Sequence, residues 1–331
     1  MLFFQSIPIH HLRGPLSHLN KVVYIVIIIM ALIRPSSLFS QGIPINQDQY
    51  LFSRPLMMGG AYTAIGEGSA SLAYNPAAIV VPGAHYTYSQ LEHKTNGIRN
   101  SVGHHLYLAP IALSSQSYQD ESLSFESKMI GFGKHVRYGV DWGITYKEVS
   151  SIYKNRSYSR SYADFGLLFK VFPYLNFGAN FHNIYSNDTD VVKRLDLGSA
   201  LFLEDNHFLV SMDTSFEKHN GEILSYGRIG TEVYITDSFL LRAGLNSDYY
   251  SAGINMGLSF FDLDYGLLYP RNKTKSELYT ISFNFGKSLY YKKFREHYAL
   301  FKPDSYAKFK LGGDLIEGKS EISLFRVSFT F

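Results

Sequence analysis

Two adjacent histidines and two closely spaced aspartates are the residues of this chain best suited by type and spacing to do chemistry. His104 and His105 offer imidazole nitrogens to a metal, and Asp262 and Asp264 have the spacing of paired carboxylates for acid–base catalysis. We interpret both segments as extended strands, in which neighbouring residues point to opposite faces. The two histidines therefore cannot hold one ion. The aspartates share a face, and polar residues in contact with solvent explain them better than a catalytic pair.

The remaining residue types exclude several other kinds of site. The 331 residues contain no cysteine, which excludes disulfides, zinc–thiolate sites, cysteine nucleophiles and iron–sulfur ligation. Serines and histidines are scattered without a recognisable catalytic motif, and Gly131-Phe132-Gly133 lacks the spacing and the following helix of a phosphate-binding loop. We therefore expect no enzyme activity, no metal and no cofactor.

The elements that position these residues show period-two alternation from residue 86 onward. In residues 251–260, Ala252, Ile254 and Met256 fall on one face, whereas Gly253 and Asn255 fall on the other. Strands of about ten residues with one apolar face are typical of a transmembrane barrel, whose outer face meets lipid. Glycine is common on the polar face, as expected where another segment approaches the wall closely.

The alternation predicts an all-β fold, a transmembrane antiparallel β-barrel of about fourteen strands. Tight turns alternate with longer polar connections, expected at residues 150–161, 186–190, 217–222 and 271–276. The third strand has a poor pattern. The expected strands are residues 84–91, 101–109, 110–118, 122–135, 137–149, 161–172, 174–185, 191–203, 206–217, 223–236, 238–247, 249–260, 261–270 and 276–287.

Composition agrees with a barrel wall that is apolar on one face and polar on the other. Charged residues make up 18% of the chain, aromatic residues 16%, and the mean hydropathy is −0.07, which excludes a helical membrane protein. The net charge of +3 gives no reason to expect a nucleic-acid partner.

The N-terminus has the features of an export signal. Arg13 and Lys21 precede the apolar residues 22–33, which are too few to span a bilayer but fit the core of a signal peptide. Cleavage after Ser40 divides the chain into a signal peptide at 1–40, an N-terminal segment at 41–82 and a barrel at 83–331. We therefore expect a bacterial outer-membrane location, with outer-membrane lipid and the barrel-assembly machinery as partners.

The segment at 41–82 lacks strand alternation and is rich in small residues, which allow backbone to pack closely against backbone. It contains Gly59 and Gly60, and later Asn75 before Pro76 and Ala77, where proline disfavours helix at the preceding residue. We expect this segment to occupy the barrel lumen as a plug.

Two motifs in this segment resemble the N-terminal signature of the fatty-acid-transporter (FadL-like) superfamily of outer-membrane barrels, including its PorV/PorQ-like branch. The first is Met-Gly-Gly-Ala-x-x-Ala at residues 58–64. The second is the family's Tyr-x-Asn-Pro-Ala, which corresponds to residues 74–77, where Asn75 follows Tyr74 without an intervening residue. The resemblance implies a fourteen-stranded barrel whose N-terminal segment folds back into the lumen. The residue after Ala77 is Ala78, where the family usually has glycine or Ala-Gly.

Two functions follow from this resemblance. The first is passive transport of a hydrophobic small-molecule ligand, as in the fatty-acid transporters. The second is a role as a component or cargo-docking subunit among secretion-system proteins, as in the PorV-like branch. A barrel that presents adhesive loops is a third alternative.

Five residues expected to face the lumen are candidates for the functional site. They either line a ligand path or hold the plug through hydrogen bonds and ion pairs, and anchoring is the simpler interpretation. They are Tyr226, Arg228, Glu232, Tyr234 and Arg242.

The C-terminal residues 288–331 leave the strand count open. They could add a hairpin and give sixteen strands, or they could supply the true last strand in place of an earlier one. The terminal Phe331 resembles the aromatic end that the barrel-assembly machinery reads.

We predict that the signal is cleaved near Ser40 and that the mature protein fractionates with the outer membrane. Because a closed barrel resists unfolding in detergent, boiling should shift its mobility on a gel. Recovery in the periplasm as a soluble protein without such a shift would contradict the prediction.

Overall fold

The computed structural model describes residues 52–286 except 66, 94–99, 120–122, 137–138, 154–155, 188–190, 204–206, 220–221, 237, 259–260 and 272–277, together with residues 322–323 and 326–327. The expected signal peptide at 1–40, residues 41–51 of the expected plug segment and Phe331 lie outside the described residues.

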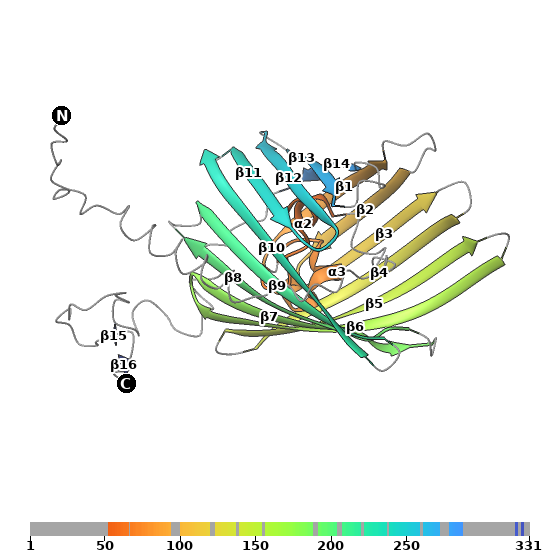
Figure 1. Ribbon diagram of the computed structural model, residues 1–331, viewed down its shortest axis with the longest axis horizontal. Helices are drawn as coiled ribbons and strands as arrows, with labels where there is room; N and C mark the ends of the chain where they lie inside the picture. Colours follow the sequence, from red (N-terminus) through yellow and green to blue (C-terminus); the bar gives the residue numbers. More distant parts are fainter. Residues whose placement is uncertain are drawn as a thin grey trace, which may run out of the picture. The chain divides into compact units, whose positions relative to one another are not determined.

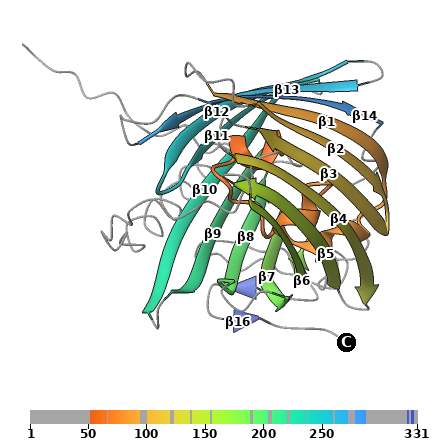
Figure 2. The same ribbon diagram turned by 90° about the vertical axis from the view of Figure 1, so that its right-hand side faces the viewer.

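Fourteen antiparallel strands form one closed barrel, in which sequential strands pair and β14 pairs with β1 (Figures 1 and 2). Closure leaves no strand edge unpaired, as a sheet in lipid requires. The strands are β1 Ala84–His93, β2 Asn100–Leu108, β3 Ile111–Gln119, β4 Leu123–Val136, β5 Val140–Tyr153, β6 Arg156–Phe172, β7 Leu175–Ser186, β8 Arg194–Leu203, β9 Phe208–His219, β10 Glu222–Thr236, β11 Phe239–Leu245, β12 Tyr249–Gly257, β13 Phe261–Pro270 and β14 Leu278–Phe285.

The wall has its apolar residues outside and its polar residues inside, the reverse of a soluble protein. In β7, Phe177 and Phe181 are 45% and 38% exposed, whereas Asn176 and Asn180 are fully buried. Period-two alternation therefore gives each strand one lipid-compatible face and one lumen face. Large apolar side chains are exposed on most of the wall, among them Leu108, Ile111, Ile130, Ile144, Leu197, Leu241 and Tyr269.

All fourteen expected strands are observed, including the third, which pairs on both sides as β3. The expectation of a long loop at residues 150–161 is wrong. Ser150 pairs with Ser159 and Tyr153 pairs with Arg156, so β5 and β6 continue almost to their connection. A backbone ladder forms whatever the side chains are, and apolar alternation marks only the part of a strand that faces lipid. The same reason extends β9 into the connection expected at 217–222.

The C-terminal alternatives are settled by the pairing of β14 with β1 over Tyr86–Phe285 to His93–Leu278. The barrel closes with β14, so the sixteen-strand interpretation and the replacement of an earlier strand are both wrong. Beyond it, β15 (Ile322–Ser323) and β16 (Arg326–Val327) pair with each other in a separate sheet.

The N-terminal residues 52–81, here called the plug, lie inside the barrel (Figures 1 and 2). The plug contains three short helical elements, α2 (Ser53–Met57), α3 (Ser71–Tyr74) and the 3-10 helix η2 (Pro76–Val80), and they contact strands on several sides of the wall. Within the described residues, no helix is long and apolar enough to cross a bilayer.

The wall is thinned by glycine where the plug touches it. Gly133, Gly143 and Gly166 are cross-strand neighbours in β4, β5 and β6, and a methyl group at Gly143 would collide with the backbone carbonyl of Pro76. Further neighbouring pairs lie on β7 and β8, on β10 and β11, and on β12 and β13, and likewise face the plug. We call the whole set the glycine belt: Gly131, Gly133, Gly143, Gly166, Gly178, Gly198, Gly230, Gly244, Gly253 and Gly266.

We predict that Gly244→Ala destabilises the plugged barrel by about 1–3 kcal/mol, because the new methyl group would overlap the backbone at Gly59. Gly227→Ala is the matched control, since a methyl group at this glycine of the adjacent strand β10 meets open space. Denaturant unfolding of the two refolded variants, followed by heat-dependent gel mobility, measures the difference. Equal midpoints would contradict the role assigned to the glycine belt.

Candidate functional site

The first contact between plug and wall depends on Gly59 and Gly60. Both have positive φ, +64° and +80°, a conformation that glycine adopts without steric cost. A Cβ at Gly59 would lie 2.5 Å from the backbone nitrogen of Leu245 and 2.9 Å from the carbonyl oxygen of Ile229. The chain can therefore turn here and press its backbone against β10 and β11 only because no side chain intervenes.

The turn at Asn75, Pro76 and Ala77 holds the plug to its own first half and to β6. The buried Asn75 amide donates to the carbonyl oxygens of Thr63 at 2.8 Å and Leu167 at 2.9 Å. Its side-chain oxygen accepts from the Ala77 backbone N–H at 3.1 Å, which caps η2, and Pro76 occupies the first position of that helix. One side chain thus satisfies three backbone groups in a buried place.

A carboxylate of the wall binds the plug backbone directly. Asp213 on β9 accepts the backbone N–H groups of Tyr62 and Thr63 through one oxygen, both at 2.8 Å. Charge-assisted hydrogen bonds of this kind are about twice as strong as neutral ones. Nothing in the local sequence of Asp213 distinguished it from other polar residues on an inward face.

Arg54 forms a bidentate ion pair between plug and wall. Its Nε and Nη2 donate to the two oxygens of Glu232 at 2.7 and 2.8 Å, and its Nη1 donates to Glu67 at 2.8 Å. The guanidinium also lies 5.6 Å from the ring centroid of Tyr62. Burial disfavours the charge of Arg54, but the facing Glu232 carboxylate outweighs it and holds the pKa of Arg54 well above its ordinary value. Arg54 therefore remains a cation.

The ion pair continues into the wall. Glu232 accepts from Arg242 Nε at 2.7 Å, and Arg242 in turn donates to Asp264. Asp264 also accepts from Asn255 at 2.9 Å and Asn284 at 2.8 Å. We call Arg54, Glu232, Arg242 and Asp264 the ion chain. It links the plug to β10, β11 and β13, and it shows that Asp264 is engaged in ion pairing.

Arg228 contacts a second part of the plug. It donates to the carbonyl oxygen of Gly60 at 3.4 Å, binds Ser215, and lies 3.2 Å from Asp196. Asp196 accepts from His182, and His182 also contacts Asp164 at 3.0 Å. His182 on β7 thus lies between Asp164 on β6 and Asp196 on β8, and Arg228 on β10 extends this group of buried charges to the plug.

The five residues predicted to face the lumen fall into two kinds in the structure. Arg228, Glu232 and Arg242 are buried and join the contacts described above. Tyr226 and Tyr234 are half-buried on the inward face of β10, on either side of Arg228 and Glu232 along the strand. A ligand path along the two tyrosines stays a prediction.

The two histidines of the sequence analysis lie on opposite faces, as expected from their adjacency. His105 is buried and bonded to Ser89 at 3.0 Å and Ser114 at 2.8 Å, whereas the exposed His104 bonds to Tyr86 at 2.7 Å. In the part of the chain that the structure describes, no group of three or more histidine, aspartate or glutamate residues could hold a metal ion.

Known structures share this architecture. The CymD monoaromatic hydrocarbon channel superposes with a TM-score of 0.55 at 13% identity, covering 72% of this chain and 97% of CymD. The P. putida toluene transporter TodX superposes with a TM-score of 0.52 at 11% identity, covering 70% of this chain and 97% of TodX. The barrel has the fold of these hydrocarbon channels. No protein-family model and no curated protein sequence matches the chain.

The likeness agrees with the fold that the fatty-acid-transporter resemblance implies, a fourteen-stranded barrel with its N-terminal segment inside. The decisive anchoring residues that sequence reasoning missed are Arg54 and Asp213. Arg54 precedes the Met-Gly-Gly motif and is the first cation of the segment after the expected cleavage site. Arg54 is a lone cation in a small-residue segment that was expected to be buried. This feature of the sequence could have predicted an ion pair between Arg54 and the wall.

We predict that Glu232→Gln loosens the plug, because it leaves the buried guanidinium of Arg242 and the partly buried guanidinium of Arg54 without their shared carboxylate. Breaking a buried pair in this way costs about 3–5 kcal/mol. Conductance in planar bilayers should rise, and proteolysis should reach the plug. Glu222→Gln is the control, since Glu222 is exposed at the other end of the same strand. Equal conductance of the two variants would refute the anchoring role of the ion chain.

Proposed function

We propose that this protein is an outer-membrane channel that passes hydrophobic small molecules passively, with movement of the plug as the controlled step. The observation that carries the proposal is the plug inside a closed barrel, attached by a few polar contacts at its edges and by apolar contacts elsewhere. The fold shared with CymD, a monoaromatic hydrocarbon channel, and TodX, a toluene transporter, supports the substrate class.

An apolar seam between plug and wall offers a route for such a molecule. Plug residues Tyr62, Ile65 and Leu72 form one buried cluster with Met129 and Phe202 of the wall. Most of the remaining lumen face is polar or charged. A hydrophobic molecule that displaces the plug would therefore meet apolar side chains along this seam, and its burial there would compensate for the disrupted packing between plug and wall.

The ion chain and the contacts of Arg228 and Asp213 act in this proposal as anchors that define the closed position. Because they lie on β9 to β11 and β13, the plug can move away from the opposite wall without breaking all of its attachments. Passage is driven by the concentration gradient alone, and no cofactor takes part.

A second candidate is the secretion role of the PorV-like branch. The observation that favours it is the dense packing of the plug, in which Met57, Met58, Ala64 and Leu72 are fully buried. A barrel whose plug never moves would serve as a rigid membrane base for a partner protein.

The absence of native cysteine allows a reversible covalent lock that separates these functions. The side-chain oxygens of Ser53 in the plug and Thr280 in β14 lie 2.5 Å apart, so Ser53→Cys with Thr280→Cys places two sulfurs within bonding reach. We predict that the reduced variant carries toluene or a fatty acid into proteoliposomes, and that oxidation lowers uptake to the level of protein-free vesicles.

Thr87→Cys with Asn284→Cys provides the matched control, because these residues bond at 2.7 Å between β1 and β14 and the cross-link joins wall to wall. Its uptake should survive oxidation. Absence of uptake by both reduced variants, with secretion proteins recovered alongside the barrel, would favour the second candidate. Equal uptake in all four states would refute control by the plug.

A further inference from the structure

The outer face of β1 to β5 contains an abrupt boundary between polar and apolar side chains. His104, Ser115, Lys128 and Glu148 are consecutive cross-strand neighbours, and all four side chains are exposed. The next outward row toward the short β2–β3 turn consists of Leu106, Leu113, Ile130 and Tyr146, which are also exposed. On a lipid-facing wall, such a boundary marks the level at which hydrocarbon gives way to lipid head groups.

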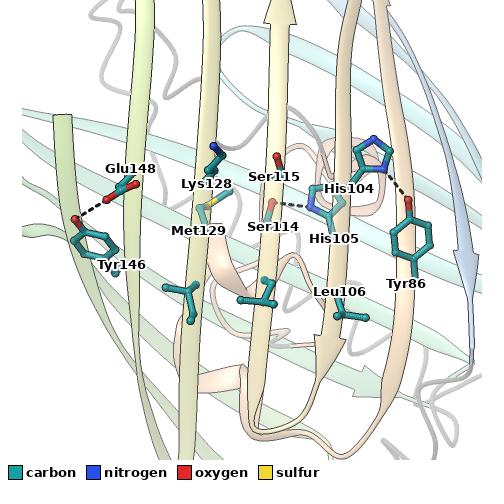
Figure 3. Close-up of a pocket in the computed structure, with 12 residues that line it drawn as sticks. Tyr86, His104, His105, Leu106, Ser114, Ser115, Lys128, Met129, Tyr146 and Glu148 are labelled. Atoms are coloured by element: carbon teal, nitrogen blue, oxygen red, sulfur yellow. Dashed lines mark hydrogen bonds between the residues drawn. The ribbon is translucent and has the colours of Figure 1, made fainter. Parts of the chain in front are cut away.

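A hollow of about 490 Å³ lies on this boundary. Figure 3 shows its side chains on neighbouring strands, with Tyr86 and His104 at one side, Tyr146 and Glu148 at the other, and Ser115 between them. Serine is the smallest member of the polar row, so the wall is indented there. The hollow is larger than a single water molecule needs and is open to the membrane side of the wall.

Both signs of charge line the hollow. Lys128 pairs with Glu126 at 3.1 Å, and both side chains are more than half exposed, so this contact is weak and exchangeable. Tyr146 donates to Glu148 at 3.3 Å and holds its carboxylate at the edge of the hollow. The Tyr86 hydroxyl bonds to Nδ1 of His104, which leaves Nε2 for a ligand.

The presence of both a cation and carboxylates around the hollow favours some lipid head groups over others. A purely anionic head group would meet Lys128 but also the carboxylates of Glu126 and Glu148. A head group with a phosphate and a primary ammonium satisfies all of them, since the phosphate accepts from Lys128, Ser115 and His104 while the ammonium donates to Glu148. A quaternary ammonium has no N–H to donate and fits less well.

We propose that this hollow binds one membrane lipid with a zwitterionic head group of the phosphatidylethanolamine type. The head group lies over Ser115 between His104 and Glu148, and one acyl chain runs along Leu106, Leu113 and Ile130. The site lies on the outside of the wall, and it depends neither on the plug nor on passage through the lumen.

The test is lipid retention by the full-length protein, measured by native mass spectrometry during titration with phosphatidylethanolamine, phosphatidylcholine or phosphatidylglycerol. One additional lipid should be retained with about fivefold preference for phosphatidylethanolamine, the gain expected from one solvent-accessible charge pair. Glu148→Gln should remove that preference, and Ser115→Phe should abolish retention by filling the indentation.

Controls on the same strands separate the site from general adhesion. Ser117→Phe adds the same bulk one outward row further along β3, and it should retain the lipid. Lys128→Ala should weaken retention about fivefold, whereas Lys134→Ala, at the other end of β4, should not. Should Ser115→Phe fail to assemble, the Lys128 and Lys134 variants decide the matter. Equal retention of the three lipids, preferential retention of lipopolysaccharide, or loss in both members of a control pair would overturn the proposal.

Discussion

The close approach of two backbones, that of the plug and that of the wall, is the constraint on which the rest of the structure depends. At Gly133, Gly143, Gly178, Gly230 and Gly244 the plug backbone lies directly against the strands, and at Gly244 even one methyl group would overlap it. Closely packed interiors transmit such overlaps as strain. The contact therefore fixes the position of the plug, and the polar anchors can then meet it with good geometry.

The arrangement of charged residues inside the barrel is a consequence of this packing. Arg54 enters the lumen on α2, and without a carboxylate its burial would cost several kcal/mol, on the order of the penalty for an unpaired buried ion. Glu232 meets it, Arg242 shares Glu232, and Asp264 neutralises Arg242. A buried ion chain adds little net stability compared with apolar packing, but it penalises any displaced position of the plug. This suits the movement proposed for the plug, which has one closed position and would leave it only when other interactions take the place of its anchors.

The sequence predicted the barrel well because the period-two pattern is itself the physical requirement of a wall between lipid and lumen. Fourteen strands followed from it, whereas the extension of β5 and β6 through residues 150–161 did not, since backbone pairing beyond the lipid needs no apolar residue. Glu232, Arg228 and Arg242 could be placed on the inward face by alternation alone. The partners of these residues could not be predicted from the sequence. Arg54 and Glu232 are 178 residues apart along the chain, and Asp213 and Tyr62 are 151 residues apart, so only the closed fold brings them into contact.

The two faces of β4 show how one pattern supports separate tasks. Its inward residues are small where the plug is close, at Gly131 and Gly133, and its outward residues change from apolar Ile130 to charged Lys128 within one row. Alternation keeps these sets apart, so the lipid proposed for the outer face and the plug inside would touch the same strand without sharing a side chain. In the proposed mechanism, the wall can therefore remain fixed in the membrane by its outer contacts while the plug moves against its inner face.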